Sequence, residues 1–531
     1  MTTSKETFPN WLNNGLVRAG SSALSGALLF ACFPLINWSF LVWVACTPLL
    51  LAVAAERRWG RGFWLGYLSG AIFLAGSCYW FVSVMQGYGG LSFLVAAGVL
   101  VLFVIIFASF YGVFGLVESL IARRSVTFAL VLSPFLWVAL ELARTYMITG
   151  FPWNLLGYAV RPVGLEQMAT VTAVYGLSFV AVSTSALLGW VVLRPAKRAG
   201  WVALAVWIAA LGVGDRLLQP PPLKLATDVA ILVQPNIPLG EAAMDTWIPW
   251  ENPAPLNSLV QKSVEAAKES GGTASNPPLV VWPETSAPFL FTRDPIFRNA
   301  LESMAKRANA YIISGTVTFL GNGNSHPQNS AVLLAPDGRL LLQYAKIHLV
   351  PFGEYVPWWA FPGKVGKITA QVGDFVPGKH VEVAQTPEGA VGIFICYEAI
   401  FPQLVRKFAA EGANVLVNIS DDGWYGDSSA PFQHFEMARF RAIENRRYLL
   451  RGTNNGITAI VDPYGRVRRE IPRNQEGILT GHFRYVSKKT FYTEHGDVFA
   501  WLCVAVAAGV VIALMLKPVS RLARNAEGQT N

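Results

Sequence analysis

The feature that most limits the possible folds is a series of apolar runs, each long enough to cross a lipid bilayer. A hydrocarbon core about 30 Å thick needs roughly 20 apolar residues of helix. Eight runs of this kind lie near 16–35, 38–55, 62–84, 91–121, 127–148, 165–193, 200–218 and 498–516. The sequence therefore predicts a polytopic α-helical membrane protein with about eight transmembrane helices.

The composition agrees with a chain that lies largely in lipid. Hydrophobic residues make up 53% of it and charged residues only 14%, whereas soluble domains average about 25% charged residues. The net charge of +9 could indicate nucleic-acid binding. However, the basic residues cluster beside the apolar runs, which favours membrane topology over phosphate recognition. We therefore expect the lipid bilayer, and no nucleic acid, as a partner.

Basic residues mark one set of the segments that connect the runs. They follow the second, fourth and sixth runs, at Arg57, Arg58, Arg61, Arg123, Arg124, Arg194, Lys197 and Arg198. The intervening turns at 34–37 and 86–90 carry no charge, and Lys517, Arg521 and Arg524 follow the last run. Cytoplasmic loops are enriched in lysine and arginine. The pattern places both termini in the cytoplasm and, by parity, the long region between the seventh and eighth runs on the extracytoplasmic side.

That long region reads as a layered α/β domain. Short β-branched runs at 228–234, 279–282, 311–317, 391–396 and 414–419 alternate with helical patterns near 255–270, 294–308, 402–411 and 432–447. Turn sequences at 336–338 and 462–465 predict added antiparallel hairpins. We expect seven transmembrane helices in 1–218, an extracytoplasmic α/β domain in 219–495, and the final transmembrane helix with a cytoplasmic tail in 496–531.

One cysteine differs from the other four. Cys32, Cys46, Cys78 and Cys503 lie in apolar runs, where a free cysteine behaves as a small hydrophobe. Cys396 is alone in the α/β region, so it has no disulfide partner there. It ends a strand-like run, the position where α/β folds expose reactive groups. By residue type alone a buried structural role is the commoner one, and a thiol nucleophile needs a base or a cation beside it.

Two charged residues that could serve Cys396 follow other predicted strands. Glu284 stands in VVWPETSAP and Lys346 in YAKIHLVPFGEYVP. Each residue alone would most often be a helix cap or a solvated charge. None of the six histidines has a local signature that marks it as a partner of the cysteine, which leaves spatial proximity open.

Taken together, these residues resemble a known catalytic signature. Glutamate, lysine and cysteine at three strand ends, within WPE, YxKxHLVPFGE and CYE, resemble the nitrilase, or carbon-nitrogen hydrolase, superfamily. With the apolar runs, the whole chain resembles its membrane-bound branch, the apolipoprotein N-acyltransferase family. GFPWN (150–154), VQPNIP (233–238) and the segment 418–447 extend the match. The resemblance implies an α-β-β-α sandwich inserted on the periplasmic side of a bacterial inner membrane.

The resemblance also implies residue roles. Glu284 would be the general base, Lys346 the stabiliser of the tetrahedral intermediate and Cys396 the nucleophile that accepts the acyl chain. The backbone N–H of Tyr397 is a second possible oxyanion donor. Further acidic positions match at Glu354 and Glu398, which either orient Lys346 or the acceptor amine, or belong to a loop hydrogen-bond network.

Other positions allow two interpretations each. Trp424 and Tyr425 resemble an aromatic pair on the family's substrate-binding loop, although ordinary loop packing would also explain them. The family's lysine-tryptophan pair after NIP is absent, and Trp247 or Trp250 could fill the tryptophan position. DDGWYGD also differs slightly from the family's more usual sequence. Glu141 and Arg144, in the fifth run, are charges within a membrane segment; they are either functional or snorkel from a helix end.

The expected activity is a two-step acyl transfer. Cys396 takes a fatty acyl chain from a membrane phospholipid as a thioester, and the N-terminal amine of a diacylglyceryl-cysteine apolipoprotein then attacks it, which predicts ping-pong kinetics. We expect no metal and no cofactor, because no cluster has the spacing of metal ligands. The alternative is a membrane-tethered amidase or nitrilase that hydrolyses a small carbon-nitrogen substrate. A transporter or scaffold is disfavoured because all three reactive residues are present.

Overall fold

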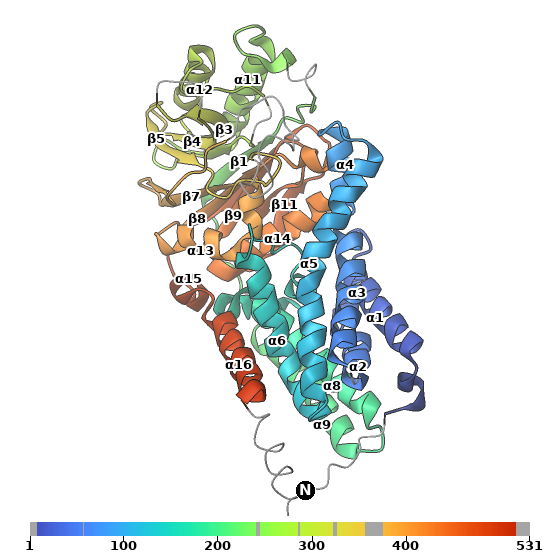
Figure 1. Ribbon diagram of the computed structural model, residues 1–531. Coiled ribbons are helices and arrows are strands. Elements are labelled where there is room, and N and C mark those ends of the chain that lie inside the picture. The colour runs from blue at the N-terminus through green and yellow to red at the C-terminus, as the bar shows by residue number, and fades with distance from the viewer. Residues whose placement is uncertain are drawn as a thin grey trace, which may run out of the picture. The chain divides into compact units, whose positions relative to one another are not determined.

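The computed structural model describes residues 8–56, 58–240, 245–284, 287–321, 326–355 and 375–516 (Figure 1). Arg57 and the predicted tail with Lys517, Arg521 and Arg524 lie outside the described residues. The chain forms two compact units. The helical unit comprises Met1–Tyr79, Val99–Gln219 and Asp497–Asn531, and the sandwich unit comprises Trp80–Gly98 and Pro220–Gly496.

The helical unit is built from apolar helices of unequal length. They are α1 (Gly15–Ala31), α2 (Thr47–Ala55), α3 (Trp59–Ser77), α5 (Phe93–Ala122), α6 (Val126–Tyr146), α7 (Val163–Glu166), α8 (Ala169–Leu193), α9 (Arg198–Leu217) and α16 (Val498–Leu516). Short 3₁₀ turns add η1 (Asn10–Asn13), η2 (Ser39–Trp43) and η3 (Leu156–Ala159). The first six residues of α5 belong to the sandwich unit.

Five of these helices are long and apolar enough to cross a membrane, namely α5, α6, α8, α9 and α16. A sixth span results if α3 and α4 (Trp80–Gly87), bent by 46° at their junction, count as one. The runs predicted at 16–35 and 38–55 form shorter apolar segments, Gly15–Ala31 and Ser39–Ala55. In the second of these, Pro48 starts a new helix after the η2 turn because proline favours the first helical turn and cannot continue a helix. The apolar helices fit a membrane protein, and the number eight stays a prediction.

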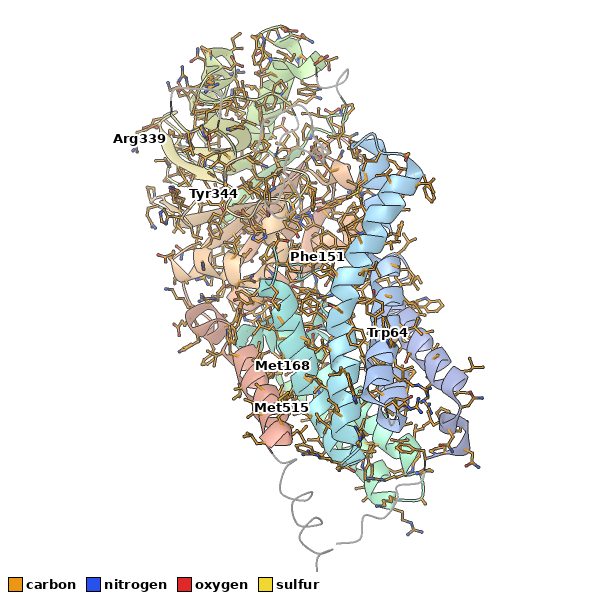
Figure 2. The ribbon with its side chains drawn as sticks, viewed as in Figure 1. Trp64, Phe151, Met168, Arg339, Tyr344 and Met515 are labelled. Atoms are coloured by element: carbon orange, nitrogen blue, oxygen red, sulfur yellow. The ribbon has the colours of Figure 1, made fainter. Side chains whose placement is uncertain are left out.

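The outer surface of the helical unit is apolar, as contact with lipid requires. Trp64 is 64% exposed and Met515 is 70% exposed (Figure 2). Phe151, in contrast, is buried. Large exposed apolar surfaces of this kind mark contact with a membrane or a partner.

Glu141 and Arg144 are buried inside the helical unit, where they are 5% and 2% exposed. Glu141 Oε1 accepts hydrogen bonds from Trp137 Nε1 (3.0 Å) and from the Leu156 N–H (2.8 Å). Arg144 donates to the Tyr111 hydroxyl and to the Trp153 carbonyl, each at 3.2 Å. The two charges therefore do not snorkel to an interface; they hold the 153–156 segment against α6.

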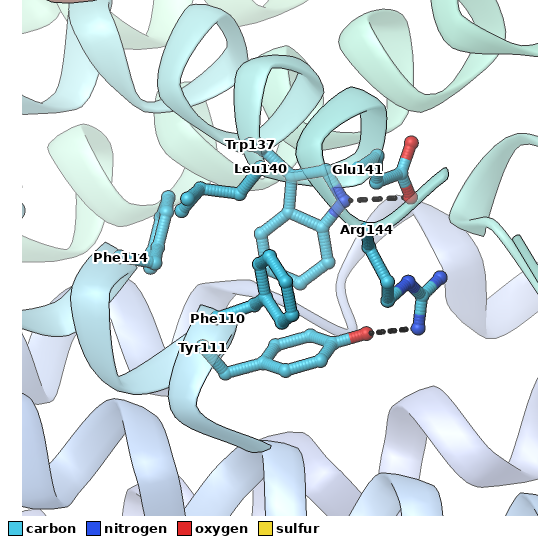
Figure 3. Close-up of a pocket in the computed structure, with 7 residues that line it drawn as sticks. All are labelled: Phe110, Tyr111, Phe114, Trp137, Leu140, Glu141 and Arg144. Atoms are coloured by element: carbon cyan, nitrogen blue, oxygen red, sulfur yellow. Dashed lines mark hydrogen bonds between the residues drawn. The ribbon is translucent and has the colours of Figure 1, made fainter. Parts of the chain in front are cut away.

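A small cavity adjoins this buried pair (Figure 3). Its volume is about 20 Å³, which is room for one water molecule. It is lined by Phe110, Tyr111, Phe114, Trp137, Leu140, Glu141 and Arg144. The cavity is too small for a lipid headgroup. The hydrogen bonds that Glu141 and Arg144 make to the 153–156 segment are sufficient to explain why these two charges are buried here.

Replacing Arg144 with methionine should destabilise the helical unit. The change removes the hydrogen bonds that Arg144 donates to the Trp153 carbonyl and to the Tyr111 hydroxyl, a loss of about 1–3 kcal/mol. Thermal unfolding of the detergent-solubilised protein measures the effect. Arg123→Met, at an exposed arginine, is the matched control and should leave the midpoint unchanged. An equal midpoint in both variants would contradict the structural role.

The sandwich unit contains two six-stranded sheets. The first has the order β12-β1-β2-β3-β4-β5, with strands β1 (Asp228–Gln234), β2 (Leu279–Val281), β3 (Tyr311–Phe319), β4 (Pro327–Leu334), β5 (Leu340–Ala345) and β12 (Gly477–Phe483). The second has the order β11-β10-β9-β8-β7-β6, with strands β6 (Val383–Gln385), β7 (Ala390–Ile395), β8 (Val415–Ser420), β9 (Tyr448–Thr453), β10 (Thr458–Val461) and β11 (Val467–Ile471). The central strands of each sheet are parallel: β1, β2 and β3 in one, and β7, β8 and β9 in the other.

Helices cover the outer face of each sheet, so the layers are α-β-β-α. α11 (Ala254–Glu269) and α12 (Pro295–Ala308) pack on the first sheet, and α13 (Pro402–Ala410) and α14 (Ala430–Asn445) on the second. The sheets meet through β1, which contacts β9 and β10. Short elements complete the unit: η4 (Asp245–Trp247), η6 (Cys396–Ile400), η7 (Asp422–Tyr425) and α15 (Phe491–His495).

The predicted α/β pattern of this region is confirmed. All five predicted strands are present as β1, β2, β3, β7 and β8, and the four predicted helices as α11 to α14. Both predicted turns join antiparallel strands, β4 to β5 and β10 to β11. The agreement follows from strong local signals: Asp294, for example, caps α12 by accepting a hydrogen bond from the Ile296 N–H (2.9 Å).

Candidate active site

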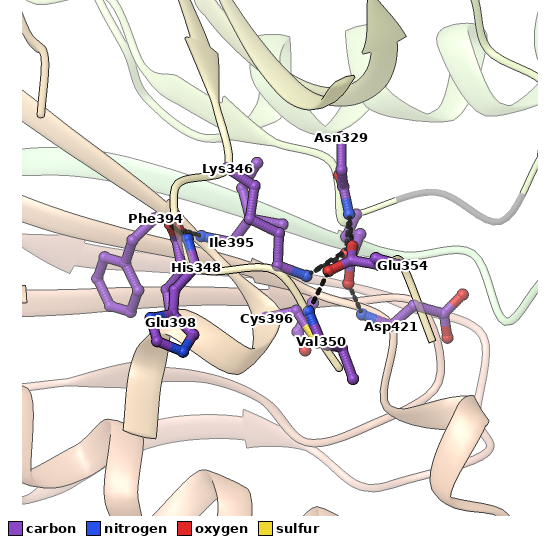
Figure 4. A network of polar contacts seen from close by, with 12 residues as sticks. Asn329, Lys346, His348, Val350, Glu354, Phe394, Ile395, Cys396, Glu398 and Asp421 are labelled. Atoms are coloured by element: carbon purple, nitrogen blue, oxygen red, sulfur yellow. Dashed lines mark hydrogen bonds and ion pairs between the residues drawn. The ribbon is translucent and has the colours of Figure 1, made fainter. Parts of the chain in front are cut away.

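The ends of several strands gather charged side chains in one place in the sandwich unit (Figure 4). Glu284 lies three residues after β2, Lys346 directly follows β5, and Cys396 directly follows β7. β2 and β5 belong to the first sheet and β7 to the second, and β5 runs antiparallel to β4. Glu284 and Lys346 are in direct contact, and both charges act on the Cys396 thiol, so the three residues predicted from separate segments lie in one region.

Lys346 is a buried cation held by two carboxylates. Its Nζ lies 2.9 Å from Glu354 Oε1 and 3.4 Å from Glu284 Oε1, and the side chain is 1% exposed. Burial lowers the pKa of Lys346, but the neighbouring Glu354 and Glu284 outweigh burial, so that the net shift of the pKa is upward. The lysine therefore keeps its positive charge at neutral pH.

Glu284 is fixed by three donors among the described residues. Its Oε1 accepts from Asn329 Nδ2 (2.7 Å) and from Lys346, and its Oε2 accepts from the Asp421 N–H (2.9 Å). A carboxylate has about four acceptor sites. These three contacts thus leave Glu284 the capacity to take a proton while its orientation is fixed.

Cys396 occupies a backbone conformation that is uncommon for a residue with a side chain. Its φ is +48°, in the left-handed region, where the chain turns from β7 into η6. Such a conformation costs roughly 1–2 kcal/mol and persists where the surroundings hold it. Burial raises the pKa of the Cys396 thiol, the Glu284 carboxylate raises it further, and Lys346 opposes them. The thiol is therefore protonated at neutral pH and needs a base to react.

The two other predicted carboxylates are both part of the hydrogen-bond network. Glu354 Oε1 accepts from Asn329 Nδ2 (2.6 Å), and its Oε2 accepts from the Val350 N–H (2.7 Å). Glu354 thus anchors the loop after β5 and touches Lys346 directly.

Glu398 connects the turn after β7 to the chain next to Lys346. Its carboxylate accepts from the N–H groups of Ile395 (2.7 Å), Ile347 (2.7 Å) and His348 (3.2 Å), and from the Tyr344 hydroxyl (2.8 Å). It therefore fixes the backbone on both sides of the site. Tyr397, one residue earlier, is buried with its ring against Phe401 (5.2 Å between centroids).

The aromatic pair on η7 packs against α4. The Tyr425 ring meets Trp80 edge-on at 5.1 Å, and the Trp424 ring meets Tyr88 at 4.9 Å. The Tyr88 hydroxyl also donates to the Gly423 carbonyl (2.8 Å). Both residues thus take part in ordinary aromatic packing, and their role in substrate binding stays a prediction.

The two candidate tryptophans after NIP differ in their surroundings. Trp247, on η4, packs partly buried against the core of the first sheet. Trp250 is exposed. The structure does not assign the family's tryptophan position to either residue.

A buried cluster near Cys396 could not be found from the sequence motifs. His434 Nδ1 lies 2.9 Å from Asp422 Oδ1, and His434 Nε2 lies 3.0 Å from the carbonyl oxygen of Cys396. Arg451 Nη2 donates to Asp422 Oδ2 (2.7 Å). Burial raises the pKa of Asp422, but Arg451 and His434 outweigh it and hold the pKa below its usual range. The one feature of the sequence that could have indicated this cluster is Arg451, because a charged side chain inside the buried strand YLLRGT requires a partner of opposite charge.

The described residues contain no group of three or more histidine, cysteine, aspartate or glutamate side chains arranged to hold a metal ion. The candidate site itself comprises a carboxylate, a cation and a thiol. That set can remove a proton, oppose a developing negative charge and form a covalent bond.

The sequence matches two families and many curated proteins. Residues 230–487 match the carbon-nitrogen hydrolase family, and residues 25–187 match the apolipoprotein N-acyltransferase N-terminal domain. A protein of Geobacter metallireducens named apolipoprotein N-acyltransferase is 37% identical over 93% of this chain and 95% of its own length. Proteins of the same name from Allorhizobium ampelinum and Methylococcus capsulatus are 32% and 31% identical, covering 95% and 89% of this chain and 95% and 88% of their own lengths.

Among solved structures, the chain is similar to an amidase from a Nesterenkonia species. The identity is 18% and the TM-score 0.37, over 51% of this chain and 94% of the amidase.

Proposed function

The chain belongs to the apolipoprotein N-acyltransferase family, and from this premise we propose how its buried site performs the reaction. The protein is a membrane acyltransferase that N-acylates lipoproteins, with a lipid as donor. The relatives do not favour the alternative of a small-molecule amidase. The observation that carries the mechanism is the Lys346 cation, held at 2.9 Å by Glu354 and in contact with Glu284, beside the protonated thiol of Cys396.

In the first step, Glu284 removes the proton from Cys396 as the sulfur attacks the ester carbonyl of a membrane phospholipid. A C–S bond forms, and the carbonyl π electrons move onto oxygen. The Lys346 ammonium and the Tyr397 N–H stabilise this oxyanion. The intermediate then collapses, the ester C–O bond breaks, and the lysophospholipid oxygen takes the proton from Glu284. The product is a thioester on Cys396.

In the second step, the N-terminal amine of a diacylglyceryl-cysteine apolipoprotein attacks the thioester. Glu284 takes a proton from the amine and returns it to the departing Cys396 sulfur, so an amide forms and the thiol is regenerated. The same cation and N–H stabilise the second oxyanion. Because the two substrates react in turn with one cysteine, the mechanism predicts ping-pong kinetics.

The apolar helices fit this chemistry. Exposing an acyl chain to water costs about 0.8 kcal/mol per CH₂, so a membrane enzyme meets both lipid substrates without extracting them. We propose that 1–218 and 496–531 are the membrane parts and 219–495 the catalytic domain. We also propose that this domain is periplasmic, that both termini are cytoplasmic and that the membrane is the bacterial inner membrane.

The decisive experiment is to incubate the purified protein with a phospholipid that carries labelled acyl chains. Intact-mass and peptide mass spectrometry should then detect one labelled chain, released by hydroxylamine, on the peptide containing Cys396. A wild-type protein that is folded and never acylated would refute the mechanism. Hydrolysis of a small amide without any lipid would instead support the amidase.

Glu284→Gln should slow thioester formation by about 10²–10⁴-fold, the usual contribution of a general base. The amide has the shape of the carboxylate but cannot take the thiol proton, and burial keeps the thiol protonated. Rapid-quench measurement of acyl-enzyme formation checks this, with Glu265→Gln, an exposed glutamate on α11, as the control. Unchanged acylation in Glu284→Gln would show that Glu284 is not the general base.

A further inference from the structure

The carbonyl oxygen of Cys396, and not only its sulfur, is held by a specific partner. His434, on α14, places Nε2 at 3.0 Å from this oxygen. A backbone carbonyl can only accept a hydrogen bond. Nε2 must therefore carry the proton and donate it, in whichever charge state the ring is.

The ring of His434 is itself fixed on its other side. Nδ1 lies 2.9 Å from Asp422 Oδ1, which also accepts from the Ser420 hydroxyl (2.8 Å). Arg451 Nη2 lies 2.7 Å from Asp422 Oδ2. All four of these side chains are fully buried. The chain after β7, the chain after β8 and the interior of β9, three neighbouring strands of the second sheet, are thereby tied to one imidazole ring.

The geometry of the peptide bond gives this contact a consequence for catalysis. The carbonyl of Cys396 and the N–H of Tyr397 belong to one planar trans peptide unit and point in opposite directions. A bond that fixes the carbonyl also fixes the direction of the N–H. Cys396 has a φ of +48°, and strained backbone of this kind keeps its orientation only where neighbours hold it.

We propose that His434 is a positioning residue of the oxyanion hole: by holding the Cys396 carbonyl, it aims the Tyr397 N–H at the oxygen of the acyl group. The inference rests on the acyl transfer proposed above. It differs from two other roles that the same contacts allow. A merely structural histidine would affect stability alone, and a histidine that tunes the thiol would alter every reaction of the sulfur.

Two substitutions separate the two bonds of the ring. In His434→Gln, the amide nitrogen lies near the position of Nε2 and can still donate to the Cys396 carbonyl. In His434→Asn, the shorter amide lies near the position of Nδ1, so it can contact Asp422 but not the carbonyl. Both variants keep a polar group in the buried space, and the midpoint of thermal unfolding in detergent shows that each is folded.

Two reactions of Cys396 are then measured in the intact protein. Thioester formation from a labelled phospholipid passes through an oxyanion, whereas alkylation by iodoacetamide does not. We expect His434→Asn to slow thioester formation by about 30-fold or more; outright removal of an oxyanion donor costs about 10²–10³-fold, and here the Tyr397 N–H is misaligned rather than removed. The rate constant at saturating phospholipid should fall and KM should stay the same. His434→Gln should stay within about threefold of wild type, and alkylation should stay within about threefold in both variants.

Three results would overturn the proposal: wild-type thioester formation in His434→Asn, an equal loss in His434→Gln, or a loss of alkylation in step with thioester formation. If His434→Asn does not fold, the folded His434→Gln variant still tests the proposal. A loss of about 30-fold in its thioester formation would contradict the proposed role of the hydrogen bond to the Cys396 carbonyl. Wild-type protein that is alkylated but never acylated would refute the acyl transfer itself, a result that none of the variant comparisons can produce.

Discussion

Cys396→Ala should yield a folded protein that carries no acyl chain after incubation with phospholipid and that transfers none to a lipoprotein. Alanine has no nucleophile, so the covalent step has no acceptor. The remaining oxyanion donors cannot compensate, because they stabilise an intermediate that no longer forms. We expect activity below detection, measured by hydroxylamine-sensitive label on the protein and by mass spectrometry of a lipopeptide acceptor.

The four other cysteines provide the control for this experiment. All lie in the helical unit and are buried. A protein in which Cys32, Cys46, Cys78 and Cys503 are all replaced by alanine should acylate Cys396 at the wild-type rate, which shows that the label depends on one particular thiol. Label on Cys396→Ala at the wild-type level would place the acyl chain elsewhere and contradict the proposed nucleophile.

Lys346→Met should produce the second largest effect. Methionine is similar in length to lysine but has no charge, so the oxyanion loses its cation while the space stays filled. Removal of one oxyanion donor typically costs 10²–10³-fold, or about 3–4 kcal/mol of barrier. We expect a loss at the upper end of that range, because Glu284 and Glu354 would also face each other without the ammonium that now lies 3.4 Å and 2.9 Å from them.

Single-turnover acylation of Cys396 measures the effect of this substitution. Lys262→Met is the matched control: Lys262 is an exposed lysine of α11, paired with Glu476. The control should acylate at the wild-type rate. Rapid acylation in folded Lys346→Met would mean that the cation is structural and that the oxyanion is stabilised by other groups.

The candidate catalytic residues that could be predicted from the sequence are those with a strong local signal. Glu284, Lys346 and Cys396 each follow a short apolar run, and β2, β5 and β7 are the strands that those runs form. The order of strands within the sheets follows from pairing between distant segments, which the local pattern does not contain. The motifs predicted a candidate site, and the fold shows which of its side chains meet.

The residues that sequence reasoning missed are those defined by distant contacts. Asn329 sits within β4, yet it bridges Glu284 and Glu354. His434 is 38 residues from the Cys396 carbonyl that it contacts. In the helical unit, counting apolar residues gave the position of each run but not the break between Ser39–Trp43 and Thr47–Ala55, because backbone geometry at a short turn depends on packing.

The division of the chain into units has a consequence for how the enzyme can be recombined. Trp80–Gly98 belongs to the sandwich unit although Val99–Gln219, a segment of the helical unit, separates it from Pro220. Through Trp80 and Tyr88 this segment packs against Tyr425 and Trp424. A chimaera that exchanges only Pro220–Gly496 between two relatives would set a foreign η7 against the native α4. Trp80–Gly98 and Pro220–Gly496 should therefore be exchanged together, so that both sides of the aromatic contact come from the same relative.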